Sequence, residues 1–171
     1  MNSLRFFVIF ISLLCLFLTN SHADEVRIGI VRHDVVSNLK QAYEKGENVN
    51  LEYLFNEQFK LFHAISHIGT SINDRGYTNS IYAGLTWYLN IFKHFFIEAS
   101  LGGGIHNGNL KKPAKKRALG SCLLFRESLS IGFKFNLHHS LSVILDHMSN
   151  ASIVSPNPGL TGFGLRYGYS W

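Results

Sequence analysis

The sequence predicts an all-β fold, namely an eight-stranded antiparallel transmembrane β-barrel. Three observations lead to this prediction: apolar residues alternate with small or polar ones, the connections alternate between short and long, and aromatic residues and glycine are abundant. Only 16% of the residues are charged, while 46% are hydrophobic and 13% are aromatic, against a usual charged content of roughly 25%. This balance excludes a disordered chain, and 171 residues are too few for a multidomain enzyme.

The first residues, 1–23, have the features of a cleaved signal peptide. A short basic segment precedes an apolar run over 6–18, and Ser21 and Ala23 are the small residues that a signal peptidase site requires. The run is too short to cross a bilayer as a helix, which takes ~20 residues. We therefore expect export through the inner membrane, cleavage after Ala23, and a mature barrel domain over 24–171.

Alternation is clearest at the C-terminal end of the chain. Between 162 and 171 the odd positions are aromatic or leucine and the even positions are glycine, serine or arginine, and the same period of two returns in 95–106 and 129–135. One face of each strand therefore suits lipid or a core, and the other accepts small and polar groups. Large outward side chains opposite small inward ones favour a membrane barrel over a soluble lipocalin-like barrel, which would place its apolar residues inside.

Segments of this kind define eight candidate strands: 25–34, 47–56, 61–72, 79–90, 94–106, 118–136, 138–149 and 160–171. The links between them alternate in length. The short links are 56–60, 90–93 and 136–138, and the longer ones are 35–46, 73–78, 107–117 and 150–159. Short periplasmic turns and long extracellular loops are typical of outer-membrane barrels, so we expect the protein in the bacterial outer membrane.

The longer link over 107–117 is strongly basic. It contains five basic residues and no acidic one: Lys111, Lys112, Lys115, Lys116 and Arg117. Two interpretations stay open, namely binding of lipopolysaccharide phosphates at the cell surface and a solvated loop without a ligand. Because no aromatic residues alternate with these bases, nucleic acid is not an expected partner.

The seventh predicted strand contains the residues that point to chemistry. His147 and Ser149 share the parity of the apolar residues in their strand, so both should face the lipid, where polar groups are costly and usually functional. A hydroxyl beside an imidazole can perform acyl transfer, because the imidazole takes the serine proton as the oxygen attacks an ester carbonyl. The other interpretation is two polar side chains in the headgroup region without a catalytic role.

Three segments in the last quarter of the chain form a set: HMSNA over 147–151, NPG over 157–159 and LRYGY over 165–169. This set resembles the PagL-type lipid A 3-O-deacylases, which are eight-stranded outer-membrane barrels. The resemblance implies hydrolysis of the ester-linked 3-hydroxyacyl chain at the 3-position of lipid A, with Ser149 as nucleophile and His147 as general base. It also implies that Asn150 and Asn157 hold or form the oxyanion hole, and that lipid A (lipopolysaccharide) and outer-membrane lipids are the partners.

One position departs from that family. The resemblance implies a glutamate fourteen residues after the histidine, where this chain has Thr161. Threonine cannot stabilise an imidazolium by charge, so either catalysis is impaired or another carboxylate has the role. If the sixth and seventh strands pair about a turn near Leu137, Glu127 lies directly opposite His147, and we expect it to be the acid that orients the imidazole. An ion pair of Glu127 with Arg126 or a lysine near the rim is the alternative.

The sequence thus predicts a serine esterase, a carboxylic ester hydrolase acting on lipid A in its own leaflet without a metal or organic cofactor. His63 and His67 have the spacing of a helical metal pair, but they lie in a predicted strand without a nearby carboxylate, so no metal site is expected. Two alternatives stay open: a non-catalytic structural or adhesin-like barrel with a decayed triad, and an acyltransferase. Acyl-chain preference and oligomeric state are also open, a homodimer included.

Overall fold

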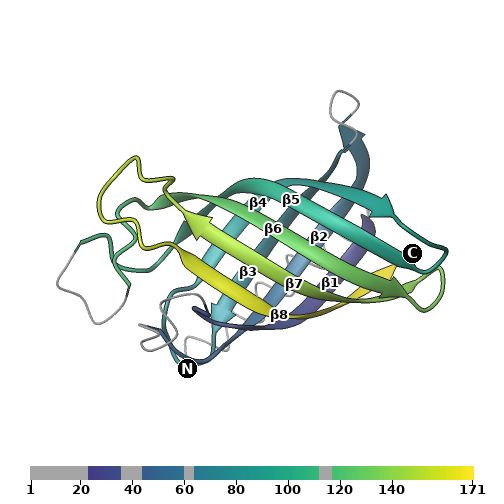
Figure 1. Ribbon diagram of the computed structural model, residues 1–171, viewed down its shortest axis with the longest axis horizontal. Helices are drawn as coiled ribbons and strands as arrows, with labels where there is room; N and C mark the ends of the chain where they lie inside the picture. The colour runs from purple at the N-terminus through teal and green to yellow at the C-terminus, as the bar shows by residue number, and fades with distance from the viewer. Residues whose placement is uncertain (1–22, 36–43, 60–63, 112–116) are drawn as a thin grey trace.

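The barrel is described by a computed structural model over residues 23–35, 44–59, 64–111 and 117–171. Its strands are β1 (Ala23–Arg32), β2 (Glu47–Phe59), β3 (Ala64–Asn73), β4 (Ser80–Asn90), β5 (Phe95–His106), β6 (Leu123–Lys134), β7 (His139–Ser149) and β8 (Leu160–Ser170). Each strand pairs antiparallel with the next, and β8 pairs with β1 to close the barrel (Figure 1). The predicted fold class is confirmed. Within the described part of the chain, no helix is long and apolar enough to cross a bilayer.

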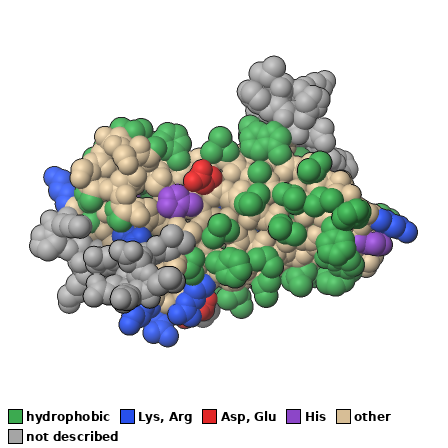
Figure 2. All heavy atoms as spheres, viewed as in Figure 1, with side chains coloured by type: hydrophobic (Ala, Val, Ile, Leu, Met, Phe, Trp, Pro, Cys, Tyr) green, Lys and Arg blue, Asp and Glu red, His purple; other side chains and the backbone are tan. Residues whose placement is uncertain are grey.

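The barrel wall is apolar outside and polar inside. In β6 exposed and buried side chains alternate strictly from Leu123 to Gly132, with leucine, isoleucine and phenylalanine prominent outside and arginine and serine prominent inside. Apolar side chains cover much of the wall seen in Figure 2. This polarity suits a barrel surrounded by lipid, and the soluble lipocalin-like alternative, with its apolar interior, is wrong.

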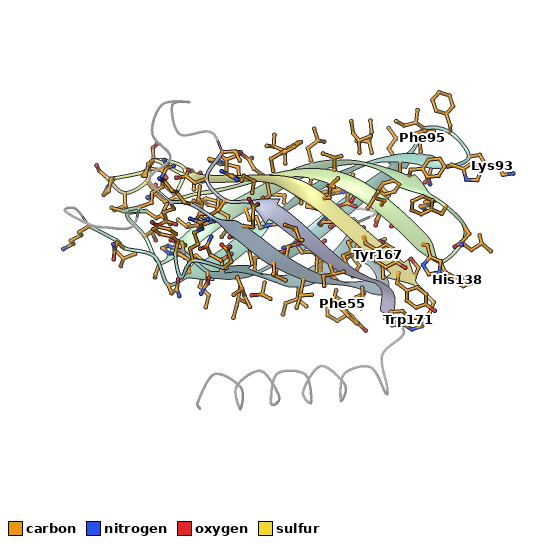
Figure 3. The ribbon with its side chains drawn as sticks, turned by 90° about the horizontal axis from the view of Figure 1, so that it is seen from below. Phe55, Lys93, Phe95, His138, Tyr167 and Trp171 are labelled. Carbon is orange, nitrogen blue, oxygen red and sulfur yellow. The ribbon has the colours of Figure 1, made fainter. Side chains whose placement is uncertain are left out.

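Aromatic side chains gather at the end of the barrel with the short turns, which we call the short-turn end. Phe55, Phe95, Tyr167 and Trp171 all lie around this end (Figure 3), and the C-terminus lies there as well (Figure 1). Aromatic girdles mark the level of the membrane interface. The long loops emerge at the opposite end, which we call the long-loop end.

A square of buried charges spans the lumen. Glu52 lies 3.1 Å from Arg27 and 2.7 Å from Arg166, and Glu98 lies 2.8 Å from each of the same two guanidinium groups. Buried charges are costly unless each is paired, and here every charge has at least two opposite neighbours. The square therefore ties together four strands, β1, β2, β5 and β8, across the interior.

Replacing Glu52 with glutamine should destabilise the barrel, because Arg166 would then keep Glu98 alone and Arg27 would keep only Glu98 and Glu25. Breaking a buried ion pair on one side costs about 3–5 kcal/mol, to be measured as the change in unfolding free energy in urea with lipid vesicles. The matched control is Glu47→Gln, whose side chain is 40% exposed and pairs with Arg32 at the rim; it should cost less than about 1 kcal/mol. Equal losses in the two variants would contradict the role of the square.

At the long-loop end, two strand boundaries differ from the prediction by two or more residues. β1 ends at Arg32 rather than at 34, because Asp34 has a positive φ of 53° and turns its carboxylate toward Arg117. β6 begins at Leu123 rather than at 118, because Leu119 leaves the wall and is fully buried over the start of the strand. Both departures occur at the long-loop end, where the chain builds contacts between loops.

Some predictions concern residues outside the described ranges. The predicted signal peptide lies almost entirely in 1–22, so cleavage after Ala23 stays a prediction. The start of the third predicted strand, 61–63, lies outside as well, and the observed strand begins at Ala64.

Candidate active site

His147 and Ser149 lie near the end of β7, close to the long-loop end. Both side chains are half-buried, and they share the face of Leu145, which is 45% exposed on the barrel wall. The predicted outward orientation of the imidazole and the hydroxyl is confirmed.

The pairing of β6 with β7 follows the predicted register. Glu127 is the direct partner of His147, and Phe125 is the partner of Ser149. On the other side of β7, Thr161 is the partner of His147. The imidazole therefore lies between a glutamate on one neighbouring strand and a threonine on the other.

The His147 ring is held from two sides. A hydrogen bond of 2.7 Å joins its Nδ1 to the Thr161 hydroxyl, which is itself buried. Gly159 lies against another edge of the ring, where a Cβ added to it would be 2.5 Å from Cε1 and 2.9 Å from Nε2. With a φ of +65°, Gly159 has a conformation that other residues rarely adopt. The hydrogen bond at Nδ1 leaves Nε2 as the ring nitrogen that can exchange a proton with a hydroxyl.

Glu127 lies opposite His147 without bonding to it. Its side chain is exposed, and within the described ranges it forms no ion pair or hydrogen bond. The contact that orients the ring comes instead from Thr161. The alternative pairing of Glu127 with Arg126 is wrong, because Arg126 points into the lumen, where its Nε lies 3.7 Å from Asp146. Asp146 faces the lumen as well, on the side of β7 opposite to His147.

The Ser149 hydroxyl has one weak contact. It accepts a hydrogen bond of 3.4 Å from the Ala151 amide, and no hydrogen bond joins it to His147 in the described structure. Catalytic hydrogen bonds are often long before substrate binds, so this geometry is compatible with a serine–histidine pair. The chain turns sharply after the serine, with positive φ at Ala151 and Ser152.

The two asparagines anchor the loop that follows β7. The Asn150 amide nitrogen donates to the carbonyls of Leu119 at 2.9 Å and Val154 at 2.8 Å, and the side chain is 3% exposed. The Asn157 side-chain oxygen accepts a 3.0 Å hydrogen bond from the Asn150 backbone amide. The Asn157 amide nitrogen has only a 3.3 Å contact with the Ser152 hydroxyl and is half-buried. Asn150 is therefore committed to the loop, while Asn157 retains a donor with only one long contact.

Arg117 changes the interpretation of the basic link over 107–117. Its guanidinium is 6% exposed and lies 3.0 Å from the Asp34 carboxylate, so one of the five bases is buried and paired. Lys111 is exposed, and the residues 112–116 lie outside the described ranges. Phosphate binding by the remaining lysines stays a prediction.

Sequence reasoning missed two carboxylates in the same group of loops. Burial raises the pKa of Asp34, and its ion pair with Arg117 opposes this shift only in part. Burial would also raise the pKa of Glu44, but hydrogen bonds from His33, Thr78 and the Arg117 amide outweigh burial and lower it. Only 11 residues of the chain are acidic. The available signal was that Asp34 directly precedes the predicted link over 35–46 and that Glu44 lies near the end of this link.

The pair considered as metal ligands does not form a described site. His67 lies in the lumen, where its Nδ1 is 2.9 Å from the Thr86 hydroxyl, and His63 lies outside the described ranges. Within those ranges no three His, Cys, Asp or Glu residues are grouped as metal ligands would be.

The fold and the site together define a class: a transmembrane β-barrel that has a serine and an oriented histidine on its lipid-facing wall. Comparison with known proteins identifies the family. The family model described as Lipid A 3-O-deacylase (PagL) matches residues 48–170, and the chain belongs to this family.

Two relatives share part of their sequence with this chain. The lipid A deacylase PagL of Bordetella bronchiseptica is 33% identical over 79 residues, which are 46% of this chain and 43% of that protein. The lipid A deacylase PagL of Pseudomonas aeruginosa is 35% identical over 72 residues, 42% of this chain and 40% of that protein. The matched segments thus span less than half of each relative.

Solved structures support the fold. The crystal structure of the outer membrane enzyme PagL superposes with a TM-score of 0.63 at 19% identity, covering 84% of this chain and 97% of that one. The N-terminal β-barrel domain of Pseudomonas aeruginosa OprF reaches a TM-score of 0.60 at 9% identity, covering 88% and 98%. At these identities the similarity concerns the barrel architecture alone.

Proposed function

We propose that this protein is an outer-membrane lipid A 3-O-deacylase, a serine esterase that hydrolyses the ester-linked 3-hydroxyacyl chain at the 3-position of lipid A. Membership of the PagL family supports the substrate and the location. The observation that supports the chemistry most directly is the hydrogen bond between His147 and Thr161, which holds the imidazole on the lipid-facing wall two residues from Ser149. The substrate would reach this site within the membrane, because its acyl chains lie beside the same wall.

In this proposal the reaction proceeds through an acyl-serine. The Ser149 oxygen attacks the ester carbonyl carbon while Nε2 of His147 takes its proton. The bond to the sugar oxygen at the 3-position then breaks, and that oxygen takes the proton from the imidazolium. Water, deprotonated by His147, attacks the acyl-serine next and releases the 3-hydroxy fatty acid, and Ser149 regains its proton. Water is therefore the only co-substrate that the reaction requires.

Thr161 and Glu127 would divide the task that a single carboxylate performs in a Ser-His-acid triad. Thr161 would fix the ring orientation through its 2.7 Å hydrogen bond at Nδ1. With its hydroxyl oxygen accepting from Nδ1–H, Nε2 would be the unprotonated nitrogen that serves as the base. Glu127 would contribute its negative charge from the paired position on β6 when the imidazole becomes cationic. Directly opposed Cβ atoms lie ~4.5–5.5 Å apart, which permits this without a permanent contact.

The asparagines would have different roles. Asn150 would act as a positioning residue, since its amide holds the loop beyond Ser149 in place. Asn157 would supply a donor for the negatively charged oxygen of the tetrahedral intermediate, because its amide nitrogen has only one long contact.

The proposal is tested by mass spectrometry of lipid A from cells that express the protein. We expect a mass decrease of one 3-hydroxy fatty acid, together with free 3-hydroxy fatty acid. An unchanged lipid A would favour the non-catalytic barrel, and transfer of the chain to another lipid without free acid would identify an acyltransferase.

Comparison of Thr161→Val with Glu127→Gln separates the two proposed contributions. Losing one neutral hydrogen bond of ~1.4 kcal/mol predicts a kcat about tenfold lower for Thr161→Val. Losing a nearby exposed charge worth ~1 kcal/mol predicts a kcat about fivefold lower for Glu127→Gln. Both are measured by release of fatty acid from lipid A in detergent. Full activity of Glu127→Gln would remove Glu127 from the mechanism, and full activity of Thr161→Val would remove Thr161.

A further inference from the structure

A buried polar network connects the loops at the long-loop end. Glu44, in the β1–β2 loop, is fully buried and accepts hydrogen bonds from the Thr78 amide at 3.1 Å, the Thr78 hydroxyl at 2.9 Å and the Arg117 amide at 2.8 Å. His33 Nε2 lies 2.6 Å from the same carboxylate. The β1–β2, β3–β4 and β5–β6 loops thus meet at a single carboxylate.

Arg117 extends this network to the fourth long loop, between β7 and β8. Its Nη1 lies 3.0 Å from the Asp34 carboxylate and donates a 2.7 Å hydrogen bond to the Gly159 carbonyl. A longer contact of 3.5 Å reaches the Pro158 carbonyl. A buried guanidinium that is paired with a carboxylate and donates to a carbonyl is a strong, directional tether.

The carbonyl that Arg117 holds belongs to the residue that touches the catalytic imidazole. Gly159 is so close to His147 that an added Cβ would lie 2.5 Å from the ring. We infer that Arg117 is a positioning residue for the deacylase: through the Gly159 carbonyl it holds the backbone that confines the His147 ring. The inference rests on the proposed function of His147 as the base.

Two parts of Arg117 act separately, which makes the inference testable. Its backbone amide binds Glu44 and is retained in every substitution, so the tie between the loops survives. Only the guanidinium reaches Gly159. Arg117→Met removes that contact but leaves the Asp34 carboxylate buried without its partner. The double variant Asp34→Asn with Arg117→Met removes the unpaired charge as well.

The experiment compares the full-length wild type with R117K, R117M and the D34N/R117M double variant, folded in detergent with lipid A. Arg32→Met is the control, because Arg32 is 65% exposed at the same rim. Two readouts are measured: kcat and KM for fatty acid release, and the rate at which a fluorophosphonate probe labels Ser149. Folding is followed by the heat-dependent shift of the barrel in gel electrophoresis.

We expect R117M and the double variant to lose about tenfold in kcat and in labelling rate, with KM changed less than about twofold, because a misplaced ring affects chemistry rather than binding. R117K should recover part of the loss by donating to the same carbonyl, and the control should equal wild type. Unchanged kcat in the folded double variant, or a loss confined to KM, would overturn the inference.

The two readouts distinguish a wrong proposed function from a wrong inference about Arg117. A wild type that releases no fatty acid from lipid A contradicts the proposed function. The labelling rate still reports on His147 and Ser149 in that case. Equal labelling of wild type and the folded double variant, including no labelling of either, then overturns the role of Arg117.

Discussion

Replacing Ser149 with alanine should abolish the release of fatty acid from lipid A. In the proposed mechanism this hydroxyl forms the covalent bond to the acyl chain, and alanine has no group that could do so. Loss of the nucleophile in a serine hydrolase typically lowers kcat by ~10³-fold or more. The measurement is release of 3-hydroxy fatty acid from lipid A by the purified protein, together with labelling by a fluorophosphonate, which should be absent in the variant.

The matched control is Ser142→Ala, because Ser142 lies on the same strand but is buried on the lumen side. It should keep both activity and labelling. A Ser149→Ala protein that still releases the fatty acid would place the nucleophile elsewhere and refute the serine mechanism. A folded wild type that is never labelled would point to the non-catalytic alternative.

The strands of the barrel could be predicted because the two faces of each strand have different surroundings, lipid on the outside and polar side chains in the lumen. β6 shows this best, since its exposed and buried positions alternate as its sequence does. The register between β6 and β7 was also predictable, because a short turn leaves little freedom in how two strands align. Contacts between side chains of distant strands across the lumen could not be predicted. Parity places Arg27 and Glu98 inside, but their 2.8 Å contact depends on the stagger of the whole barrel.

In the candidate site, too, features within one strand could be predicted, whereas contacts between distant segments could not. His147 and Ser149 could be named from one strand, because their outward parity placed two polar groups in lipid. The hydrogen bond between His147 and Thr161 could not be predicted from strand geometry, since a ten-residue loop between β7 and β8 does not determine their register. Arg117 was harder still: its partners come from two other loops, and sequence alone shows it only as part of a basic run.

Substituting Gly159 with alanine should be the most damaging change that leaves every proposed reacting group in place. The new methyl group would lie 2.5 Å from Cε1 of His147 in the present backbone, so the ring or the loop must move. A displacement of about 1 Å at a catalytic group can lower the rate by ~100-fold. We therefore expect kcat to fall by about that factor, measured by release of fatty acid from lipid A.

The control for this variant isolates the steric effect from backbone strain. Gly76 has a φ of +72°, close to the +65° of Gly159, but nothing lies within 4 Å of the position that its Cβ would take. Gly76→Ala therefore imposes a similar conformational cost, ~1–2 kcal/mol, without touching the site, and should retain full activity. If both alanine variants lose activity equally, strain in the loops explains the loss. If neither does, the ring can shift without consequence, and the confinement of His147 by Gly159 has no catalytic role.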